Sequence, residues 1–553
     1  MLLRLRGARI YDPANRVDGE IRDLYLRDGR IVATPAADEP IDHDHDLAGR
    51  VVMAGAIDMH THIGGGKLNI ARAMLPEDHR GDPVSRTGLT RASSGHAAPG
   101  TFATGYRYAE MGYTACFEPA ILPVNARQAH LEMGDTPIVD KGGYVMLGSD
   151  DFLLRLMAAG SDQKLINDYV AWTLHATHCI GIKVVNPGGI SAFKFNQRKM
   201  DLDEQHSFYG VTPRDILRVL SRAVHELGVP HPLHVHSSNL GLAGNVDTTL
   251  GTIRASEGLP IHLTHIQFHS YGTEGDRKFS SAAAQVAEAI NTTPNASCDV
   301  GQILFGQTVT ASGDSMAQYR NSGLAHPRKY VVMDIECDAG CGVLPFKYRD
   351  HSFVNALQWA VGLEIFLLVN DPWRVFLTTD HPNGAPFTTY PHLIRLLMDR
   401  TFRNERLALI NAEAQALTTV GSIDREYSLY EIAILTRAAP ARLLGLRDLG
   451  HLGPGAVADI TVYRDHPDRE RMFSVPEYVF KDGEIVVRDG KVVRVTWGRY
   501  HRVQPEYDRG IERRLKQHFE RYQTMRADHL RITPDEMHAF GHGADVVTHP
   551  CRP

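Results

Sequence analysis

Short apolar strands alternate with amphipathic helices through the middle of the chain, and this alternation limits the available folds more than any other feature. One clear unit begins at Thr212, a helix-capping residue, followed by Pro213 at a position that suits the first helical turn. Apolar residues then recur at helical spacing until Gly228, and an apolar strand covers residues 232–236. Because such units continue over about 350 residues, the pattern predicts a parallel α/β sheet, either a (βα)8 barrel or a doubly wound fold.

Both ends of the chain have a different pattern, in which apolar runs are joined by Asp-Gly turns. These turns lie at residues 28–29, 482–483 and 489–490. Asp-Gly between apolar runs is a strong hairpin signal. The two ends therefore predict one small β-sandwich domain built from residues 1–52 and 433–497, with two unrelated sheets as the alternative.

The remaining residues divide accordingly. Residues 53–432 are expected to form the α/β barrel, since the strand–helix units lie there. Residues 498–553 are polar and charged, and they predict a C-terminal surface extension.

Composition excludes several classes of protein. The chain of 553 residues has a net charge of −6, which argues against a dedicated nucleic-acid-binding protein. No apolar run reaches the about 18 residues that suggest a membrane-spanning helix, and the start of the chain lacks the features of a secretory signal. The six cysteines include no Cys-x-x-Cys pair, and the pair Cys337 and Cys341 is interpreted as structural. We therefore expect a cytoplasmic protein with neither nucleic-acid nor membrane partners.

The 29 histidines are clustered, and the first cluster is His60-Thr-His62 at the end of an apolar strand. Two residues apart on a strand, both imidazoles point to the same side, with about 7 Å between their backbone positions. Such a pair can hold one metal ion. Three glycines follow at 64–66, where a loop begins, so we interpret the pair as metal ligands rather than as two structural histidines. Barrel enzymes place their catalytic groups at this end of the strands.

A lysine, Lys183, lies in the middle of the apolar segment 179–185. Burial of an ammonium group costs several kcal/mol unless the group is paired or neutral. A neutral amine can take up CO2 as a carbamate, an anion whose two oxygens suit a bridge between two divalent metal ions. From this segment alone, the ordinary alternative of a lysine that pairs with an acidic side chain is favoured.

Two further strands with histidines follow, one βα unit apart. His236 and His265 lie nearest the points where strand gives way to loop, and we predict both as metal ligands. Their neighbours His234 and His262 are predicted to support them. Further candidates for supporting contacts or alternative ligation are Asn186, Asn239 and His381.

Asp380 ends the apolar run 374–380, just before a turn. A carboxylate at a strand end can bind a metal ion and also transfer a proton. The alternative is an ordinary helix cap. Motifs for other chemistries are absent, since the chain has no phosphate-binding loop of the Walker type, no Gly-x-Ser-x-Gly and no His-Glu-x-x-His.

In this order, His-x-His, Lys, His, His and Asp resemble the two-metal sites of the amidohydrolase superfamily, which includes hydantoinases and dihydroorotases. Segments 60–67, 181–188, 234–245 and 379–384 are most similar to the family of the formylmethanofuran dehydrogenase A subunit, and within it to the A subunit of bacterial formyltransferase/hydrolase complexes. Hydantoinase-like proteins typically lack the long insert that this chain has at 64–110. The resemblance covers the chain up to the C-terminal extension and implies a TIM-like amidohydrolase barrel.

The resemblance also implies a role for each candidate residue. The implied metal ligands are His60, His62, Lys183, His236, His265 and Asp380. The first two histidines would bind one divalent ion and the other two a second, with zinc as the expected metal. Lys183, carboxylated to N6-carboxylysine, would bridge the two ions, and Asp380 would act as general base and acid.

For function, the resemblance implies hydrolysis of N-formylmethanofuran to formate and methanofuran, a step of one-carbon metabolism during formaldehyde oxidation. The implied partners are a formyltransferase and the other subunits of a hetero-oligomeric complex, together with methanofuran as the formyl carrier. Two other functions stay open. One is a cyclic-amide or N-acyl hydrolase of the same superfamily, against which the insert and the Asn-Pro-Gly-Gly after Lys183 argue. The other is a non-catalytic scaffold protein, which would be expected to have lost ligands and to hold no metal.

Overall fold

The computed structural model describes residues 1–197, 200–311, 335–336 and 342–551. Cys337 and Cys341, interpreted above as structural, lie outside these residues. None of the helices in the described parts of the chain combines the length and the apolar character needed to cross a membrane.

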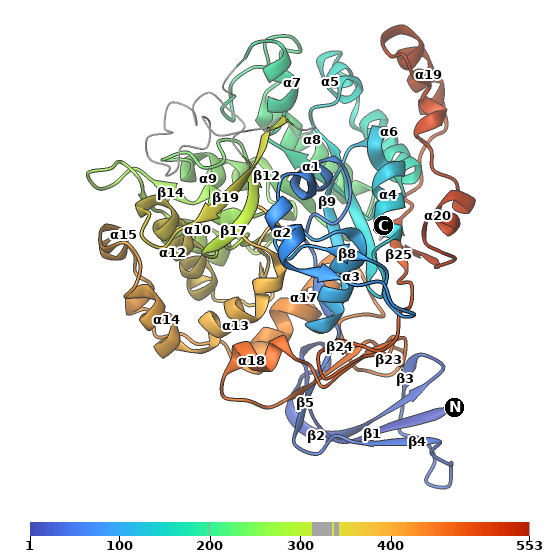
Figure 1. Ribbon diagram of the computed structural model, residues 1–553. Coiled ribbons are helices and arrows are strands. Elements are labelled where there is room, and N and C mark those ends of the chain that lie inside the picture. Colours follow the sequence, from blue (N-terminus) through green and yellow to red (C-terminus); the bar gives the residue numbers. More distant parts are fainter. Residues whose placement is uncertain (198–199, 312–334, 337–341, 552–553) are drawn as a thin grey trace.

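Eight parallel strands form the centre of the molecule (Figure 1). In sheet order they are β6 (Ala56–Asp58), β9 (Tyr113–Ile121), β10 (Asp140–Leu147), β11 (Gly181–Val185), β12 (Leu233–His236), β13 (Ile261–Leu263), β16 (Ala296–Asp299) and β20 (Val375–Phe376). The ring closes because Thr61, just after β6, forms a parallel bridge with His381, just after β20. The N–H of His62 also donates to the His381 carbonyl at 2.9 Å. This closure excludes an open doubly wound sheet and confirms the predicted TIM-like barrel.

Helices cover the outside of the barrel, and the unit predicted from Thr212 shows why they form. The helix is α8 (Pro213–Glu226), and Thr212 forms a capping box with Asp215, whose N–H donates to the Thr212 hydroxyl at 3.1 Å. Its apolar face is buried, and β12 follows, as predicted. The other helices that flank the strands are α3 (Thr101–Glu110), α4 (Ala126–Gly134), α5 (Asp151–Ala158), α6 (Gln163–Thr177), α7 (Gly189–Lys194), α9 (Val246–Ala255), α10 (Ala283–Thr292), α12 (Phe353–Leu368), α13 (Tyr390–Met398), α14 (Arg400–Leu407), α15 (Ala412–Ala416), α16 (Leu429–Ala433) and α17 (Ala439–Leu444).

Two excursions from the barrel pack against each other. The insert after His62 contains α1 (Gly66–Ala73), α2 (Pro76–Gly81), β7 (Pro83–Val84) and β8 (Ser93–Ser94). The second excursion, which we call the arm, consists of β17 (Gly306–Ala311), β18 (Ile335–Glu336) and β19 (Gly342–Tyr348). Leu68 and Leu75 of the insert share a small apolar core with Val309 and Val343 of the arm.

Both ends of the chain meet in a second sheet, of nine strands, which lies below the barrel in Figure 1. Its strands are, in order, β24 (Lys491–Val492), β23 (Glu484–Arg488), β22 (Tyr478–Lys481), β21 (Ile460–Arg464), β5 (Arg50–Ala54), β1 (Leu2–Asp12), β2 (Val17–Arg27) and β3 (Arg30–Val32), with β4 (His43–Asp46) beside β1. β5 pairs with β21, so the two chain ends share one hydrogen-bonded sheet. Asp28 and Gly29 have φ values of 50° and 76°, as a type I′ hairpin turn requires.

The C-terminal segment is not confined to the surface, and in this respect the expectation of a surface extension is wrong. Its elements are β25 (Tyr500–Val503), α19 (Gly510–Tyr522), α20 (Pro534–Phe540) and β26 (Val546–His549). β25 pairs with β10 through Tyr500 and Lys141, and β26 pairs with β25. Tyr500 and Val503 are buried, because β25 lies beside the amino-terminal end of a barrel strand.

A buried ion-pair cluster joins the barrel, the nine-stranded sheet and the C-terminal segment. Lys481 Nζ on β22 lies 2.8 Å from Asp140 Oδ2 on β10 and 2.6 Å from Asp459 Oδ2. His501 Nε2 on β25 lies 3.4 Å from the same Asp140 oxygen. Burial works to lower the pKa of Lys481, but the two carboxylates outweigh it and raise that pKa above its usual value.

Candidate metal centre

Three predicted ligands meet at the carboxyl-terminal end of the barrel. His60 and His62 follow β6, Asp380 follows β20, and the barrel closes between them. Asp380 Oδ1 lies 3.0 Å from His60 Nε2 and 3.5 Å from His62 Nε2. All three side chains are buried, and their donor atoms lie within 4.8 Å of one another. Closure of the barrel thus brings His60 and His62, which follow its first strand, together with Asp380, which follows its last strand, in one potential metal site.

A second group of donors comes from the neighbouring strands. His236 ends β12, His265 follows β13, and His269 ends the short helical turn Ile266–His269. Their ligand nitrogens also lie within 4.8 Å of one another, and the ring centroids of His236 and His265 are 4.6 Å apart. His269 was not predicted, although its spacing of four residues from His265 was a signal that the two could lie on one face of a helical turn.

Lys183 lies in β11, between these groups in strand order. It pairs with His234 of β12, and Val185 pairs with His236. Lys183 and His236 therefore lie on adjacent strands, two residues out of register with each other. The Lys183 side chain is 2% exposed. Burial lowers its pKa to about 8, and among the described residues no acid forms an ion pair with it. The structure therefore shows a buried lysine without an ion pair among the described residues, whose lowered pKa makes the neutral amine more accessible than in an ordinary lysine.

Two carboxylates that the sequence analysis missed hold the His-x-His pair in place. Glu118 on β9 accepts from His62 Nδ1 at 2.9 Å and from the Ile63 N–H at 2.7 Å. Asp299 at the end of β16 lies 3.3 Å from His60 Nδ1. Carboxylates in such positions orient histidine ligands and raise their basicity. Both residues lie in apolar strands near the loop side, which was the same signal that identified Asp380.

The residues predicted to support the ligands divide into two sets. His234 Nε2 lies 2.8 Å from His60 Nδ1, and His262 Nε2 lies 3.1 Å from Asp299 Oδ2, so both contact the network around His60. Among the described residues, His381 is in none of the groups of histidines and acids that could hold a metal ion, and the Asn186 N–H donates to the His236 carbonyl at 2.9 Å. Asn239 donates to Asp201, which lies before α8, and to Thr248 of α9, and His381 contributes its backbone to barrel closure.

Charge states in the site suit metal binding. Burial lowers the pKa of His236 and of His265 well below the usual value, which leaves both imidazoles in the neutral form that ligates metals. Burial works to raise the pKa of Asp380, but His265, His60 and His62 hold that pKa well below its usual value. His265 Nδ1 is buried without a hydrogen-bond partner among the described residues. Burial works to lower the pKa of His60, but Asp299 holds it above the usual value. The neutral imidazoles of His236 and His265, the ionised Asp380 and an unsatisfied donor atom form a set that fits divalent metal ions such as zinc.

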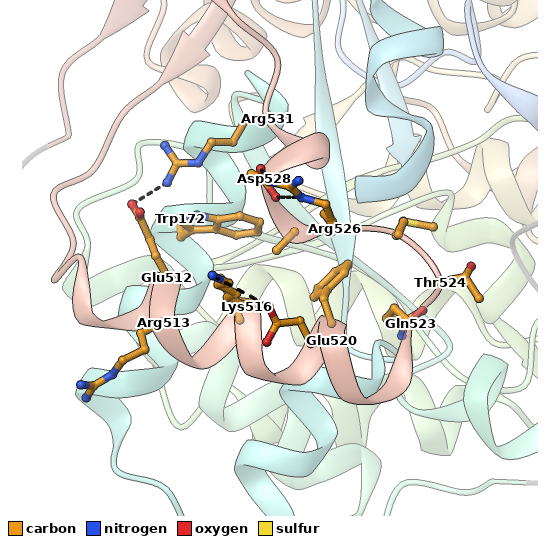
Figure 2. Close-up of a pocket in the computed structure, with 14 residues that line it drawn as sticks. Trp172, Glu512, Arg513, Lys516, Glu520, Gln523, Thr524, Arg526, Asp528 and Arg531 are labelled. Atoms are coloured by element: carbon orange, nitrogen blue, oxygen red, sulfur yellow. Dashed lines mark hydrogen bonds and ion pairs between the residues drawn. The ribbon is translucent and has the colours of Figure 1, made fainter.

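A cavity on the outer wall of the barrel is separate from these donor groups. The cavity has a volume of 790 Å3 and is lined by Trp172 of α6 and by residues of the segment 512–531. Figure 2 shows these side chains, and none of the candidate ligands is among them. Several of its charged side chains are paired with each other, as Arg531 is with Glu512 and Arg526 with Asp528. This cavity therefore supplies no chemistry comparable to that of the histidine groups.

Comparisons with known proteins point to the same chemistry. A family described as "Amidohydrolase family" matches residues 45–494. The A subunit of the formyltransferase/hydrolase complex Fhc of Methylorubrum extorquens is 43% identical over 525 residues, which are 94% of this chain and 94% of the relative. The chain belongs to the amidohydrolase family, in the group of the Fhc A subunit.

Other relatives extend the comparison. Protein FwdA of Methanocaldococcus jannaschii is 39% identical to this amidohydrolase over 513 residues, 89% of each chain. The crystal structure of the formyltransferase/hydrolase complex FhcABCD from Methylorubrum extorquens, in complex with methylofuran, contains a chain with a TM-score of 0.91 and 40% identity that covers 100% of both chains. The predicted family and class of enzyme are thereby confirmed: the protein is a metal-dependent amidohydrolase, which acts on C–N bonds.

Proposed function

We propose that this chain hydrolyses N-formylmethanofuran to formate and methanofuran, as the hydrolytic component of a formyltransferase/hydrolase complex in one-carbon metabolism. The observation that carries the proposal is the meeting of His60, His62 and Asp380 beside a second histidine group at one end of the barrel. Similarity to the Fhc A subunit over 94% of the chain supports the substrate class, because the solved Fhc complex contains methylofuran. A formyltransferase partner follows from the same relative.

Two divalent metal ions, expected to be zinc, fit the two donor groups. We assign His60 and His62 to one ion and His236 and His265 to the other, with His269 as a further donor beside the second. The bound ions supply Lewis acidity, which polarises the formyl carbonyl and makes water a better nucleophile.

Lys183 is proposed to bridge the two ions as a carbamate. Its neutral nitrogen adds to the carbon of CO2 and loses a proton, which leaves an anionic group with two oxygens. The pKa of about 8 supports this step, because an appreciable fraction of the amine is then neutral near pH 7 to 8. The carbamate also supplies the negative charge that the neutral histidines lack.

Asp380 is proposed to move the proton. Its pKa lies well below the usual value, so it starts ionised and can accept a proton from the attacking water. The same proton then passes to the leaving nitrogen as the C–N bond breaks, which yields formate and the free amine. The formyl carbon gains the remaining OH of the water, and the second proton leaves to solvent as the formic acid ionises to formate, so atoms and protons balance.

Formate release from N-formylmethanofuran tests the proposal, measured with the full-length chain and the proteins that co-purify with it. We expect release by the wild type, loss of release in Asp380→Asn, and wild-type release in Asp276→Asn, a matched change of an exposed acid. Two metals per chain without formate release would favour a cyclic-amide or N-acyl hydrolase. Neither metal nor release would favour a scaffold protein.

A further inference from the structure

The two carboxylate oxygens of Asp380 face different surroundings. Oδ1 lies 3.0 Å from His60 Nε2 and so faces the first metal group. Oδ2 accepts a hydrogen bond of 2.9 Å from Asn383 Nδ2. Asn383 is 3% exposed, and no step described so far uses it. The orientation of the Asp380 carboxylate therefore depends on the buried side-chain amide of Asn383, three residues further along the same loop.

The orientation of the Asn383 amide is determined by the arm. The N–H of Ala311, the last residue of β17, donates to Asn383 Oδ1 at 3.1 Å. A backbone N–H can only donate, so the atom that faces it must be the amide oxygen, and the NH2 group is left to face Asp380. The Tyr348 hydroxyl, at the end of β19, donates to the backbone carbonyl of Asn383 at 3.0 Å and so holds the loop beside that amide.

The arm is itself firmly placed. Ala311 and Tyr348 lie at opposite ends of the β17–β19 ladder, so they hold Asn383 from two separated points. Thr308 on the same strand donates to the Pro382 carbonyl of the loop. Val309 and Val343 pack on the insert, which anchors the arm to the segment that follows His62. A shift of the amide would therefore break several contacts at once.

We propose that Asn383 is a positioning residue for the proton-transfer carboxylate. By donating to Oδ2 it prevents rotation of the Asp380 carboxylate, so that Oδ1 stays on the side of the metal group. Oδ2 can still accept a second hydrogen bond, because each carboxylate oxygen has two lone pairs. Oδ2 is then the oxygen that takes up and returns the proton. This inference rests on the proposed hydrolysis.

Two variants of Asn383 separate its hydrogen bond to Asp380 from its hydrogen bond with Ala311 of the arm. Asn383→Asp retains an oxygen for the Ala311 N–H but has no NH2 group, whereas Asn383→Ala loses both contacts. We expect either variant to lower kcat for formate release by roughly 10- to 100-fold, because small misplacements of a reacting group have effects of that size. KM should change less than about threefold, and metal per chain should equal that of the wild type, since neither substrate binding nor ligation is removed. Asn291→Asp is the control and should retain kcat, because the Asn291 side-chain amide contacts the backbone of Leu368 and Asn370 and not Asp380.

Each outcome has a distinct meaning. A normal kcat in Asn383→Asp with a low kcat in Asn383→Ala would show that the arm contact alone matters, and would overturn the inference. So would a normal kcat in both variants, an equal loss in Asn291→Asp, or a loss of metal in parallel with kcat. A wild type that releases no formate would instead overturn the proposed function and, with it, this inference.

Discussion

Two buried lysines in this protein have opposite chemistry. Lys481 lies at the amino-terminal side of the barrel, 2.8 Å from Asp140 and 2.6 Å from Asp459, and its pKa is raised above the usual value. Lys183 lies in a barrel strand near the histidine groups, and burial lowers its pKa to about 8. Both side chains are almost completely buried, at 1% and 2% exposed.

The difference shows that burial alone does not decide what a lysine does. Where carboxylates lie within ion-pair distance, the ammonium stays charged and joins three parts of the molecule. Where no described acid lies so close, desolvation favours the neutral amine, which is nucleophilic. The first arrangement links separate parts of the fold, and the second leaves a nitrogen that is suited to the proposed carbamate formation.

The largest expected effect is that of replacing Lys183, the lysine near the histidine groups. Lys183→Ala removes the proposed bridge between the metal ions, so formate release should fall on the order of 1000-fold or more, with metal lost from the protein. Formate assays and metal analysis of the purified protein measure both. Lys491→Ala, a change of an exposed lysine in β24, should have no effect. Full activity in Lys183→Ala would refute the bridging role.

On the structural side, Lys481→Met should lower the free energy of unfolding by roughly 3–5 kcal/mol, because it leaves two buried carboxylates without a cation. Urea denaturation of the purified protein measures the change, with Lys491→Met as the exposed control. Adding Asp140→Asn and Asp459→Asn should recover much of the loss. If Lys481→Met were as stable as the wild type, the ion-pair cluster would have no stabilising role.

Glu118→Gln tests whether the Glu118 carboxylate holds His62 in place for metal binding. It keeps the shape of the side chain but removes the charge that orients His62, so metal affinity should fall about 10- to 100-fold. Competition with a chelator measures this affinity. The free energy of unfolding without metal should change far less than in Lys481→Met. An unchanged metal affinity would contradict the assigned role of Glu118.

The smallest effect concerns pH. With a pKa of about 8, the Lys183 amine should be about one-tenth neutral at pH 7 and about nine-tenths neutral at pH 9. Since only the neutral form adds CO2, the carbamate signal of metal-free protein in 13C-labelled bicarbonate should rise several-fold over this range at equal dissolved CO2. NMR detects this signal, and Lys183→Ala should lack it. A signal independent of pH between 7 and 9 would contradict the lowered pKa.

Local patterns in the sequence were sufficient for the strand–helix units and for naming most of the candidate ligands, whereas the barrel was implied by the family resemblance and decided by closure of the sheet. Helical spacing after Thr212 and the strand that follows are set by neighbouring residues, and the structure has both where they were predicted. The ligand candidates could be found for a similar reason, since most of them lie where an apolar run gives way to a polar loop. Carboxyl ends of parallel strands meet at one side of a barrel, so these residues were expected to converge.

Only the tertiary structure decided which partners each group has. Asn383 reaches Asp380 within one loop, but its orientation depends on Ala311, 72 residues away in the sequence. Likewise, nothing local to Lys481 or Lys183 shows that, among the described residues, only the first has carboxylates within ion-pair distance. The charge of a buried group is set by atoms within a few ångströms, and in this protein those atoms come from distant parts of the chain. The sequence by itself determined the strand–helix units and the residues able to do chemistry, and the tertiary structure decided which of these residues are charged, oriented and placed together.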